Sequence, residues 1–332
     1  MASDPMWTAV LQQPGELIAT TVARPSPADL GPGEVLLQVE AGGICGSDGP
    51  FLRGAPTRFG TPAMPGFWGP PGFPMHEVAG EVLASRHSDI AVGERVVGWA
   101  DRFDGASEMV VTNGDSVATY DAGLAPHQAV LLQPLACVLH AVGRLGDVRN
   151  RRCAVLGVGP IGALFVHVLA DAGTASVVAV DRVGRTASRG DLRATEVLVQ
   201  DGAGWAAGLA SAGDDARPEV VVEAVGHQVA TLQDAIEAVA PSGTVLYFGV
   251  PDSDIYPLDM EQLVRKHLTL MAGGTLQRRR ALARADAYLR RHPELVDTLV
   301  THAFSRATIQ DAYDCAMRPA RGRLKVVVDL RG

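Results

Sequence analysis

Apolar and polar positions follow two different patterns in the two halves of the chain. Up to about residue 120, short apolar or alternating runs are bounded by Gly, Pro, Asn or Asp, which is typical of β-strands in a barrel-like domain. The clearest of these runs are 34–41, 76–85, 94–97 and 108–112. From about residue 125, apolar runs alternate with stretches of helical periodicity. This alternation predicts βαβ units and a mostly parallel sheet.

The second pattern predicts particular elements. Strands are expected at 153–156, 176–180, 219–225, 244–250 and 268–272, with a closing strand at 323–330. Helices are expected at 128–145, 161–172, 228–239, 276–291 and 306–318, and the basic triplet at 278–280 is expected to be a solvated helix face. A chain of 332 residues is long enough for two domains. We place one domain at 1–134 and 275–332 and the other at 135–274.

A glycine motif lies between the first two strands of the second half. Gly157, Gly159 and Gly162 follow an apolar run and open a helical pattern as G-x-G-x-x-G. In a dinucleotide-binding turn the first glycine makes the bend, the second lets backbone approach a pyrophosphate, and the third lets helix pack on strand. The pyrophosphate then sits at a helix N-terminus. The strand before and the helix after this motif predict a Rossmann domain.

Asp181 ends the next strand, about 20 residues beyond the motif, where a carboxylate can accept hydrogen bonds from an adenosine ribose. This position favours NAD over NADP. The alternative is that Arg182, Arg185 and Arg189 reach a 2′-phosphate, although three such arginines are also typical of a solvated helix face.

Composition and charge narrow the class of protein. The net charge of −8 argues against a nucleic-acid or anionic-membrane partner. No apolar run is long enough to span a membrane, and the first residues lack the pattern of a signal peptide. The four cysteines, Cys45, Cys137, Cys153 and Cys315, form no paired motif, which fits a reducing cytoplasm.

Three residues of the first half can bind a metal. Cys45 offers a thiolate, His76 an imidazole and Glu77 a carboxylate, which are ligands that zinc accepts. Three protein ligands with one open position indicate a catalytic rather than a structural zinc site. Spacing alone leaves open that Cys45 is a small buried apolar residue and His76 a hydrogen-bonded strand-end histidine.

Several segments together resemble the medium-chain dehydrogenases/reductases, in their zinc-dependent alcohol and polyol dehydrogenase branch. The segments are GGICGSD, PMHEVAGEV with Met75 in place of a glycine, GERVVG, QPLA, GVGPIG, VVVEAVG and the terminal GRLKVVVDL, and they occur in the family's order over nearly the whole chain. The resemblance is closest to sorbitol-type and aminocyclitol dehydrogenases. It implies a GroES-like β-barrel catalytic domain beside the Rossmann domain.

The resemblance also implies roles for individual residues. Cys45, His76 and Glu77 would be zinc ligands or their neighbours, Ser47 would relay the substrate proton, and Asp48 would orient the histidine. The alternative for Ser47 and Asp48 is an ordinary turn after a strand. The remaining cofactor-binding residues that it implies, besides the glycines and Asp181, are Pro160, Ile161, Arg182, Ala224, Val225 and Gly249.

Two features depart from the family pattern. Gln133 stands where the polyol branch usually has a glutamate, so that a neutral amide replaces an anionic ligand or zinc–water partner. The run WADRFDGAS at 99–107 contains no cysteine where the family has a structural zinc lobe. We therefore expect one catalytic zinc, with Gln133 a doubtful ligand, and no structural zinc.

The resulting hypothesis is NAD-dependent oxidation of a secondary alcohol of polyol, cyclitol or amino-cyclitol type to a ketone, or the reverse reaction. One alternative is a zinc-free NAD(P)H-dependent reductase of the same superfamily, which Gln133 favours. Another is a nucleotide-binding protein that has lost its redox site.

The segment 51–75, with Phe67, Trp68 and Phe73, is expected to line the substrate site or simply to pack as a loop. The resemblance also implies that strand 268–272 lies at the sheet edge that pairs across a two-fold axis in this family, so we expect a dimer or a tetramer built from dimers.

Overall fold

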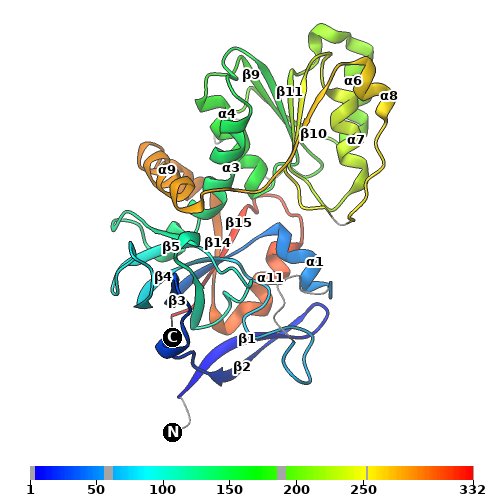
Figure 1. The fold of residues 1–332 in the computed structure, drawn as a ribbon. Coiled ribbons are helices and arrows are strands. Elements are labelled where there is room, and N and C mark those ends of the chain that lie inside the picture. The colour runs from blue at the N-terminus through cyan, green and yellow to red at the C-terminus, as the bar shows by residue number, and fades with distance from the viewer. Residues whose placement is uncertain (1–3, 56–62, 185–191, 252, 332) are drawn as a thin grey trace. The chain divides into compact units, whose positions relative to one another are not determined.

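The computed structural model of the chain describes residues 4–55, 63–184, 192–251 and 253–331 (Figure 1). These residues form two compact units. The first comprises Met1–Cys137, Leu276–Arg318 and Lys325–Gly332, and the second comprises Val138–Thr275 and Pro319–Leu324. Among the described residues, no helix is long and apolar enough to cross a membrane.

The first unit is built on a seven-stranded sheet and a separate hairpin. The sheet runs in the order β14-β15-β3-β4-β5-β7, with β6 paired to β3, and all its pairs are antiparallel except β14 with β15. Its strands are β3 (Glu34–Ile44), β4 (Glu77–Ser85), β5 (Arg95–Trp99), β6 (Met109–Asn113), β7 (Val117–Thr119), β14 (Val300–Ser305) and β15 (Lys325–Asp329). The hairpin pairs β1 (Pro5–Gln13) with β2 (Glu16–Ala23).

The first unit also contains α-helices. They are α1 (Gly49–Leu52), α2 (Pro126–Ala129), α9 (Arg278–Arg291), α10 (Glu294–Leu299) and α11 (Ile309–Met317), and α11 packs on β15 with Tyr313 fully buried. One-turn 3-10 helices of this unit lie at Pro27–Asp29, Gly46–Asp48, Gly114–Ser116 and Arg306–Thr308, and another, Asp214–Ala216, lies in the second unit.

The helix expected at 128–145 is interrupted. The chain forms α2 and then α3 (Leu132–Arg144), so the single uninterrupted helix was a wrong prediction. Pro134 explains the break, because a proline has no N–H to donate and is tolerated in the first turn of a helix but not in its interior. The new helix therefore begins just before this proline.

The second unit is a six-stranded parallel sheet in the order β10-β9-β8-β11-β12-β13. Its strands are β8 (Arg152–Leu156), β9 (Ser176–Asp181), β10 (Glu196–Val199), β11 (Val220–Glu223), β12 (Thr244–Tyr247) and β13 (Thr269–Met271). In this order the strand sequence reverses between β8 and β11, which is the Rossmann topology, and it confirms the predicted fold class. Ligands of such sheets bind outside the carboxyl ends of the strands at the reversal.

Helices flank this parallel sheet. They are α4 (Pro160–Asp171), α6 (Gly202–Ala212), α7 (Val229–Ala238) and α8 (Met260–Arg265), and α6 and α7 lie side by side (Figure 1). Val220, Val221 and Val222 of β11 are fully buried. A strand covered on both faces reads as a continuous apolar run, which is why the sequence pattern located it.

Candidate active site

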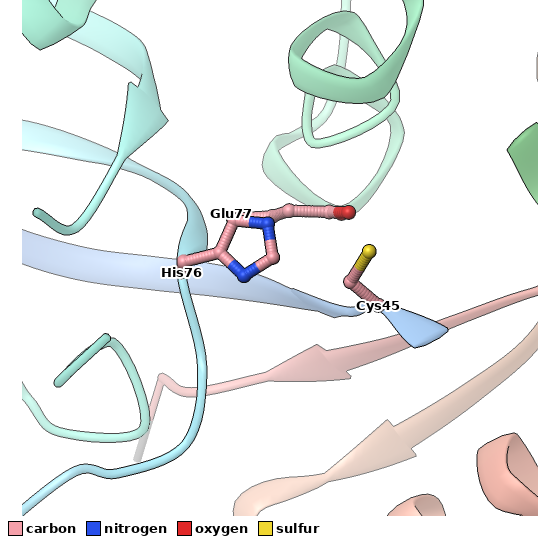
Figure 2. Close-up of side chains that lie close together, drawn as sticks. All are labelled: Cys45, His76 and Glu77. Carbon is pink, nitrogen blue, oxygen red and sulfur yellow. The ribbon is translucent and has the colours of Figure 1, made fainter. Parts of the chain in front are cut away.

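Cys45, His76 and Glu77 come together at one end of two neighbouring strands. Cys45 follows β3 directly, His76 precedes β4, and Gly43 of β3 pairs with Glu77 of β4 in the antiparallel register. One ligand atom from each of the three side chains lies within 4.8 Å of the other two (Figure 2). The structure thus brings together the three residues that the sequence proposed as ligands.

Asp48 connects two members of this group. Its Oδ2 accepts the backbone N–H of Cys45 at 2.9 Å, and its Oδ1 lies 3.0 Å from His76 Nδ1. The carboxylate is fully buried in the one-turn helix Gly46–Asp48. A carboxylate bound to one imidazole nitrogen fixes the ring's tautomer and orientation, which leaves the other nitrogen free for a metal.

The electrostatics of His76 reflect this arrangement. Burial lowers the pKa of His76, but the Asp48 carboxylate and the Cys45 sulfur outweigh that effect and raise the pKa to about 10. The main favourable partner of a protonated His76 is therefore the Asp48 carboxylate on the Nδ1 side of the ring.

Lys325 is a residue of this site that the sequence analysis missed. Its ammonium group forms an ion pair with Oε2 of Glu77, and Nζ also donates to the carbonyl of Ile44 at 3.0 Å. Lys325 comes from β15, which pairs with β3 beside Cys45. The signal in the sequence was a lysine within the apolar run of the closing strand, at a position where a solvated residue is unexpected.

Two adjacent glycines of β3 make room for these side chains. An added Cβ at Gly43 would lie 2.3 Å from Glu77 Oε2, and one at Gly42 would lie 2.1 Å from Met75 Sδ. Met75, which stands where the resembled family has glycine, is fully buried over Gly42. The substitution at position 75 is therefore accommodated without displacing His76 from the group.

The donor set fits a zinc ion. A thiol, an imidazole and a carboxylate converge, and the buried Oε1 of Glu77 has no hydrogen-bond partner among the described residues. A buried carboxylate oxygen without a partner is costly unless a cation or a donor occupies the space beside it. The ion pair with Lys325 satisfies the charge of Glu77 only through its other oxygen.

Two further residues named from the sequence are Ser47 and Gln133. Ser47 is half-buried in the turn between Cys45 and Asp48. Gln133 is buried in the first turn of α3, and its Nε2 donates to Cys137 Sγ at 3.8 Å. The amide of Gln133 therefore has an internal partner of its own.

The three glycines of the nucleotide motif occupy three different environments. Gly157 has a φ of +89°, and an added Cβ there would lie 2.6 Å from a Val225 side-chain carbon. An added Cβ at Gly162 would lie 1.8 Å from the Gly157 carbonyl oxygen, whereas Gly159 has open space around it. These are the turn, the close packing of helix on strand, and the space for a pyrophosphate that such a motif needs. Pro160 and Ile161 form the first turn of α4 between them.

Asp181 is tied to the glycine loop. Its Oδ2 accepts the backbone N–H of Val158 and its Oδ1 that of Val183, each at 2.7 Å. A carboxylate offers about four lone-pair sites, so ribose hydroxyls can still be accepted. Arg182 is exposed beside it, and Arg185 and Arg189 lie outside the described residues.

The loops after β11 and β12 lie against each other. An added Cβ at Gly249 would lie 2.3 Å from the Gly226 Cα, and Ala224 donates its N–H to Leu156. Glu223, which the sequence analysis did not single out, is fully buried and accepts the N–H groups of Val225 and Gly226 at 3.0 and 3.1 Å. Ala224, Val225 and Gly249 thus belong to loops at the carboxyl ends of neighbouring strands, β11 and β12.

The aromatic residues of the segment 51–75 do not behave alike. Phe73 is buried and lies 5.2 Å from the Phe51 ring, while Phe67 is half-buried and Trp68 is exposed, with its Nε1 bonded to the Gly54 carbonyl. Loop packing accounts for Phe73, and a substrate-facing role for these residues stays a prediction.

A Rossmann sheet with a dinucleotide loop, in a chain that also carries a thiol, an imidazole and a carboxylate poised for a metal, defines an oxidoreductase of the alcohol dehydrogenase class. Comparison with known proteins agrees. Residues 31–180 match the family profile described as Alcohol dehydrogenase GroES-like domain, and residues 127–330 match Glucose dehydrogenase C-terminus.

Relatives with named activities match most of the chain. D-altritol 5-dehydrogenase of Agrobacterium fabrum is 31% identical over 313 residues, which are 83% of this chain and 86% of that protein. L-galactonate-5-dehydrogenase of Escherichia coli is 25% identical and covers 96% of this chain and 97% of its own length. Among solved structures, an alcohol dehydrogenase from Thermus sp. ATN1 has a TM-score of 0.79 at 22% identity and covers 98% of this chain and 100% of its own. An E. coli alcohol dehydrogenase complexed with NADH has the same TM-score at 20% identity and covers 99% and 100%.

The chain therefore belongs to the medium-chain dehydrogenases/reductases, in the zinc-type alcohol and polyol dehydrogenase branch. It is an enzyme that uses a nicotinamide dinucleotide to interconvert a secondary alcohol and a ketone.

Proposed function

We propose that this enzyme oxidises a secondary hydroxyl of a polyol, a cyclitol or a sugar acid with NAD, and that one zinc ion is bound by Cys45, His76 and Glu77. The observation that carries the proposal is the convergence of these three side chains within 4.8 Å, with Asp48 bonded to His76 behind them. The substrate class is supported by the names of the relatives, which act on L-galactonate and D-altritol.

Several residues of the chain would have separate roles in the reaction. A bound zinc would act as a Lewis acid that lowers the pKa of the substrate alcohol. Asp48 would hold His76 in the tautomer that a metal requires, and Ser47, in the turn beside Cys45, would accept the hydroxyl proton and pass it on. The glycine loop would hold the dinucleotide that takes up the hydride from the substrate carbon.

The preference for NAD over NADP is proposed from Asp181. Its carboxylate lies at the end of β9, where a 2′-phosphate would meet like charge. The relatives do not decide this point, because one is named as an NAD(P)-dependent idonate dehydrogenase and a similar structure was solved with NADP.

The alternative is a zinc-free reductase of the same superfamily. Two observations favour it: Lys325 already neutralises Glu77, and the amide of Gln133 replaces an anionic group. Metal analysis of protein purified without chelator separates the two proposals. Under the zinc mechanism, Cys45→Ser abolishes both metal and turnover, Gln133→Glu retains or tightens the metal, and full activity after exhaustive chelation contradicts the mechanism.

The substrate is best identified with a panel. Polyols, cyclitols, amino-cyclitols and sugar acids are offered with NAD, and NADH formation is followed by absorbance. Turnover of a compound with a secondary hydroxyl by the unmodified protein, absent from Cys45→Ser, supports the proposal. An unmodified protein active only on enones, quinones or aldehydes with NAD(P)H supports the alternative.

We further propose a homodimer, or a tetramer of dimers, in which β13 pairs with its symmetry mate. β13 is the last strand of the parallel sheet, and Leu270 on it is exposed. Met260 and Val264 of α8, which precedes β13, are exposed as well. An open apolar edge is otherwise a liability for uncontrolled pairing.

A reducing cytoplasmic location is proposed from the cysteines, because none of the four forms a disulfide among the described residues.

A further inference from the structure

The turn at residues 100–105 of the first unit forms backbone hydrogen bonds with the chain at Met75 and His76. Ala100 donates its N–H to the His76 carbonyl at 2.8 Å, Met75 donates to the Phe103 carbonyl at 2.8 Å, and Gly105 donates to the Met75 carbonyl at 2.9 Å. The turn follows β5 and contains no regular secondary structure of its own. Its backbone therefore fixes the place from which the His76 side chain projects.

Phe103, within this turn, also contacts the imidazole. Its ring centroid lies 4.5 Å from that of His76 at an interplanar angle of 38°, and Phe51 packs edge-on against its other side at 5.5 Å. Phe103 has a φ of +58°, a left-handed conformation that a bulky residue adopts only when its surroundings enforce it. Contacts with other parts of the first unit must therefore stabilise the turn 100–105 in this conformation.

The Asp101 side chain binds the turn 100–105 to the segment 112–116. Its carboxylate accepts hydrogen bonds from Thr112 Oγ1 at 3.0 Å, from the backbone N–H of Asn113 at 3.1 Å and from Ser116 Oγ at 2.9 Å. Arg278 of α9 completes the group: its Nη1 binds both Asp101 and Ser116, and its guanidinium lies 4.9 Å from the Trp99 ring centroid. A residue far away in sequence thus pins the turn that touches His76.

The same helix carries a natural control. Arg279, the next residue, pairs with Asp89 at 2.8 Å, and the Asp89 side chain is 63% exposed. The prediction that residues 278–280 form a solvated face holds for Arg280, which is exposed, whereas Arg278 and Arg279 are half-buried and form ion pairs. Both ion pairs join α9 to other parts of the first unit, but only Arg278 binds a residue of the turn 100–105.

We propose that Asp101 and Arg278 are positioning residues for the candidate zinc ligand His76, acting through the turn 100–105 and the ring of Phe103. This inference rests on the proposed function, because it assigns His76 to the metal. Asp48 fixes the imidazole from its Nδ1 side, and Phe103 fixes its face. Together they confine the ring's rotation and leave one nitrogen directed to the metal.

The test compares Arg278→Gln and Asp101→Asn with Arg279→Gln. Each protein is loaded with Co²⁺ in place of zinc, and the visible ligand-field spectrum, the Co²⁺ affinity, kcat and the KM for NAD are measured. We expect Arg278→Gln and Asp101→Asn to bind Co²⁺ about tenfold more weakly, because the loss of contacts that orient a metal ligand commonly weakens metal binding by this factor. Both variants should also have a changed spectrum and a lower kcat. The KM for NAD should stay constant, Arg279→Gln should match the unmodified enzyme, and Arg278→Lys should recover part of the loss.

A second variant keeps the test decisive if the charge variants fail to fold. Phe103→Leu leaves the Asp101 contacts in place and removes only the ring contact, so it should shift the Co²⁺ spectrum without a comparable loss of melting temperature. A folded Arg278→Gln or Phe103→Leu protein with an unchanged spectrum and affinity overturns the inference while the proposed function stands. An unmodified protein that binds no Co²⁺ overturns both.

Discussion

Lys325 and Glu77 form an ion pair in which each side chain is only 1% exposed. The pair joins β15 to β4, the strand that begins with Glu77, and both strands pair with β3. Glu77 is also one of the residues that would hold a zinc ion, so its carboxylate has a second candidate role besides the ion pair with Lys325. Glu77 is therefore both a candidate ligand and a structural link.

Removing Lys325 should destabilise the metal-free enzyme. Lys325→Met leaves the Glu77 carboxylate buried without a cation, and breaking a buried pair in this way costs about 3–5 kcal/mol of unfolding free energy. The double variant Lys325→Met with Glu77→Gln should recover most of that loss, since no uncompensated charge remains. Urea unfolding of the three proteins after chelation measures both effects. Equal stability of the single variant and the unmodified enzyme would show that the pair contributes nothing.

Asp104 should make stability depend on pH. Burial raises the pKa of Asp104 to about 6 from its usual 3.8, and its Oδ1 has no hydrogen-bond partner among the described residues. The folded protein thus holds a proton that the unfolded chain releases at lower pH. The stabilisation is complete below about pH 4 and is lost as the pH rises through about 6.

Asp104→Asn removes this dependence. The variant should be about 1–2 kcal/mol more stable than the unmodified enzyme at pH 7 and no more stable near pH 4, because its amide has no proton to lose. Chemical unfolding at pH 4, 5.5 and 7 gives the comparison, with the exposed Asp4→Asn as the control. A constant difference across this range would contradict the assignment.

The sequence predicts the Rossmann unit well because most of its elements can be recognised from short stretches of neighbouring residues. The strand β11 is a run of valines, and the motif at Gly157 sits between a strand and a helix. Among the described residues between β9 and β11, the strand β10 and the helix α6 were not predicted. The β10 strand has only four residues, and α6, GAGWAAGLASA, is rich in glycine and alanine and has little apolar periodicity. Its start depends on Asp201, whose side chain caps the Gly204 N–H.

The candidate site was predicted for the residues to which the family resemblance assigns roles. Cys45, His76 and Glu77 are three of these, so their assembly was expected before the structure, whereas Lys325 lies in a family-like segment but had no assigned role. The contacts of Lys325 and Arg278 could not be read from the sequence, because each depends on pairing between distant parts of the chain. β15 must add to β3, and α9 must reach the turn after β5, before either side chain meets its partner.

Asp181 should control the choice of cofactor. Asp181→Ala should narrow the preference for NAD over NADP by about 1–2 kcal/mol, as expected for one lost charged hydrogen bond. It should also weaken binding of both dinucleotides, because Asp181 holds the Val158 N–H of the glycine loop. Asp181→Asn keeps an acceptor for that N–H and serves as the control. Fluorescence titration with NADH and NADPH measures each affinity, and tighter NADPH binding by the unmodified enzyme would refute the assignment.

Leu270 should be important for self-association. Its side chain is 38% exposed on β13, the edge strand of the parallel sheet. Leu270→Lys places two like charges near the proposed two-fold axis and should shift the enzyme toward monomer at micromolar concentration. Val199→Lys changes an exposed valine on β10, at the opposite edge of the same sheet, and should leave the oligomer intact. Sedimentation velocity distinguishes the two, and a monomeric unmodified enzyme would exclude the dimer.

Gly159 and Gly162 should respond oppositely to the same substitution. At Gly162 an added methyl group would meet the Gly157 carbonyl oxygen at 1.8 Å, so α4 must move away from β8 and the fold must lose stability. At Gly159 the methyl group would have no atom of the described residues within 4 Å. If that space belongs to the pyrophosphate, Gly159→Ala should unfold at the same temperature as the unmodified enzyme yet bind NAD at least tenfold more weakly, a loss of about 1.4 kcal/mol. Gly162→Ala should melt several degrees lower. Calorimetry and NADH titration of both variants test the assignment, and unchanged NADH affinity in Gly159→Ala would place the cofactor elsewhere.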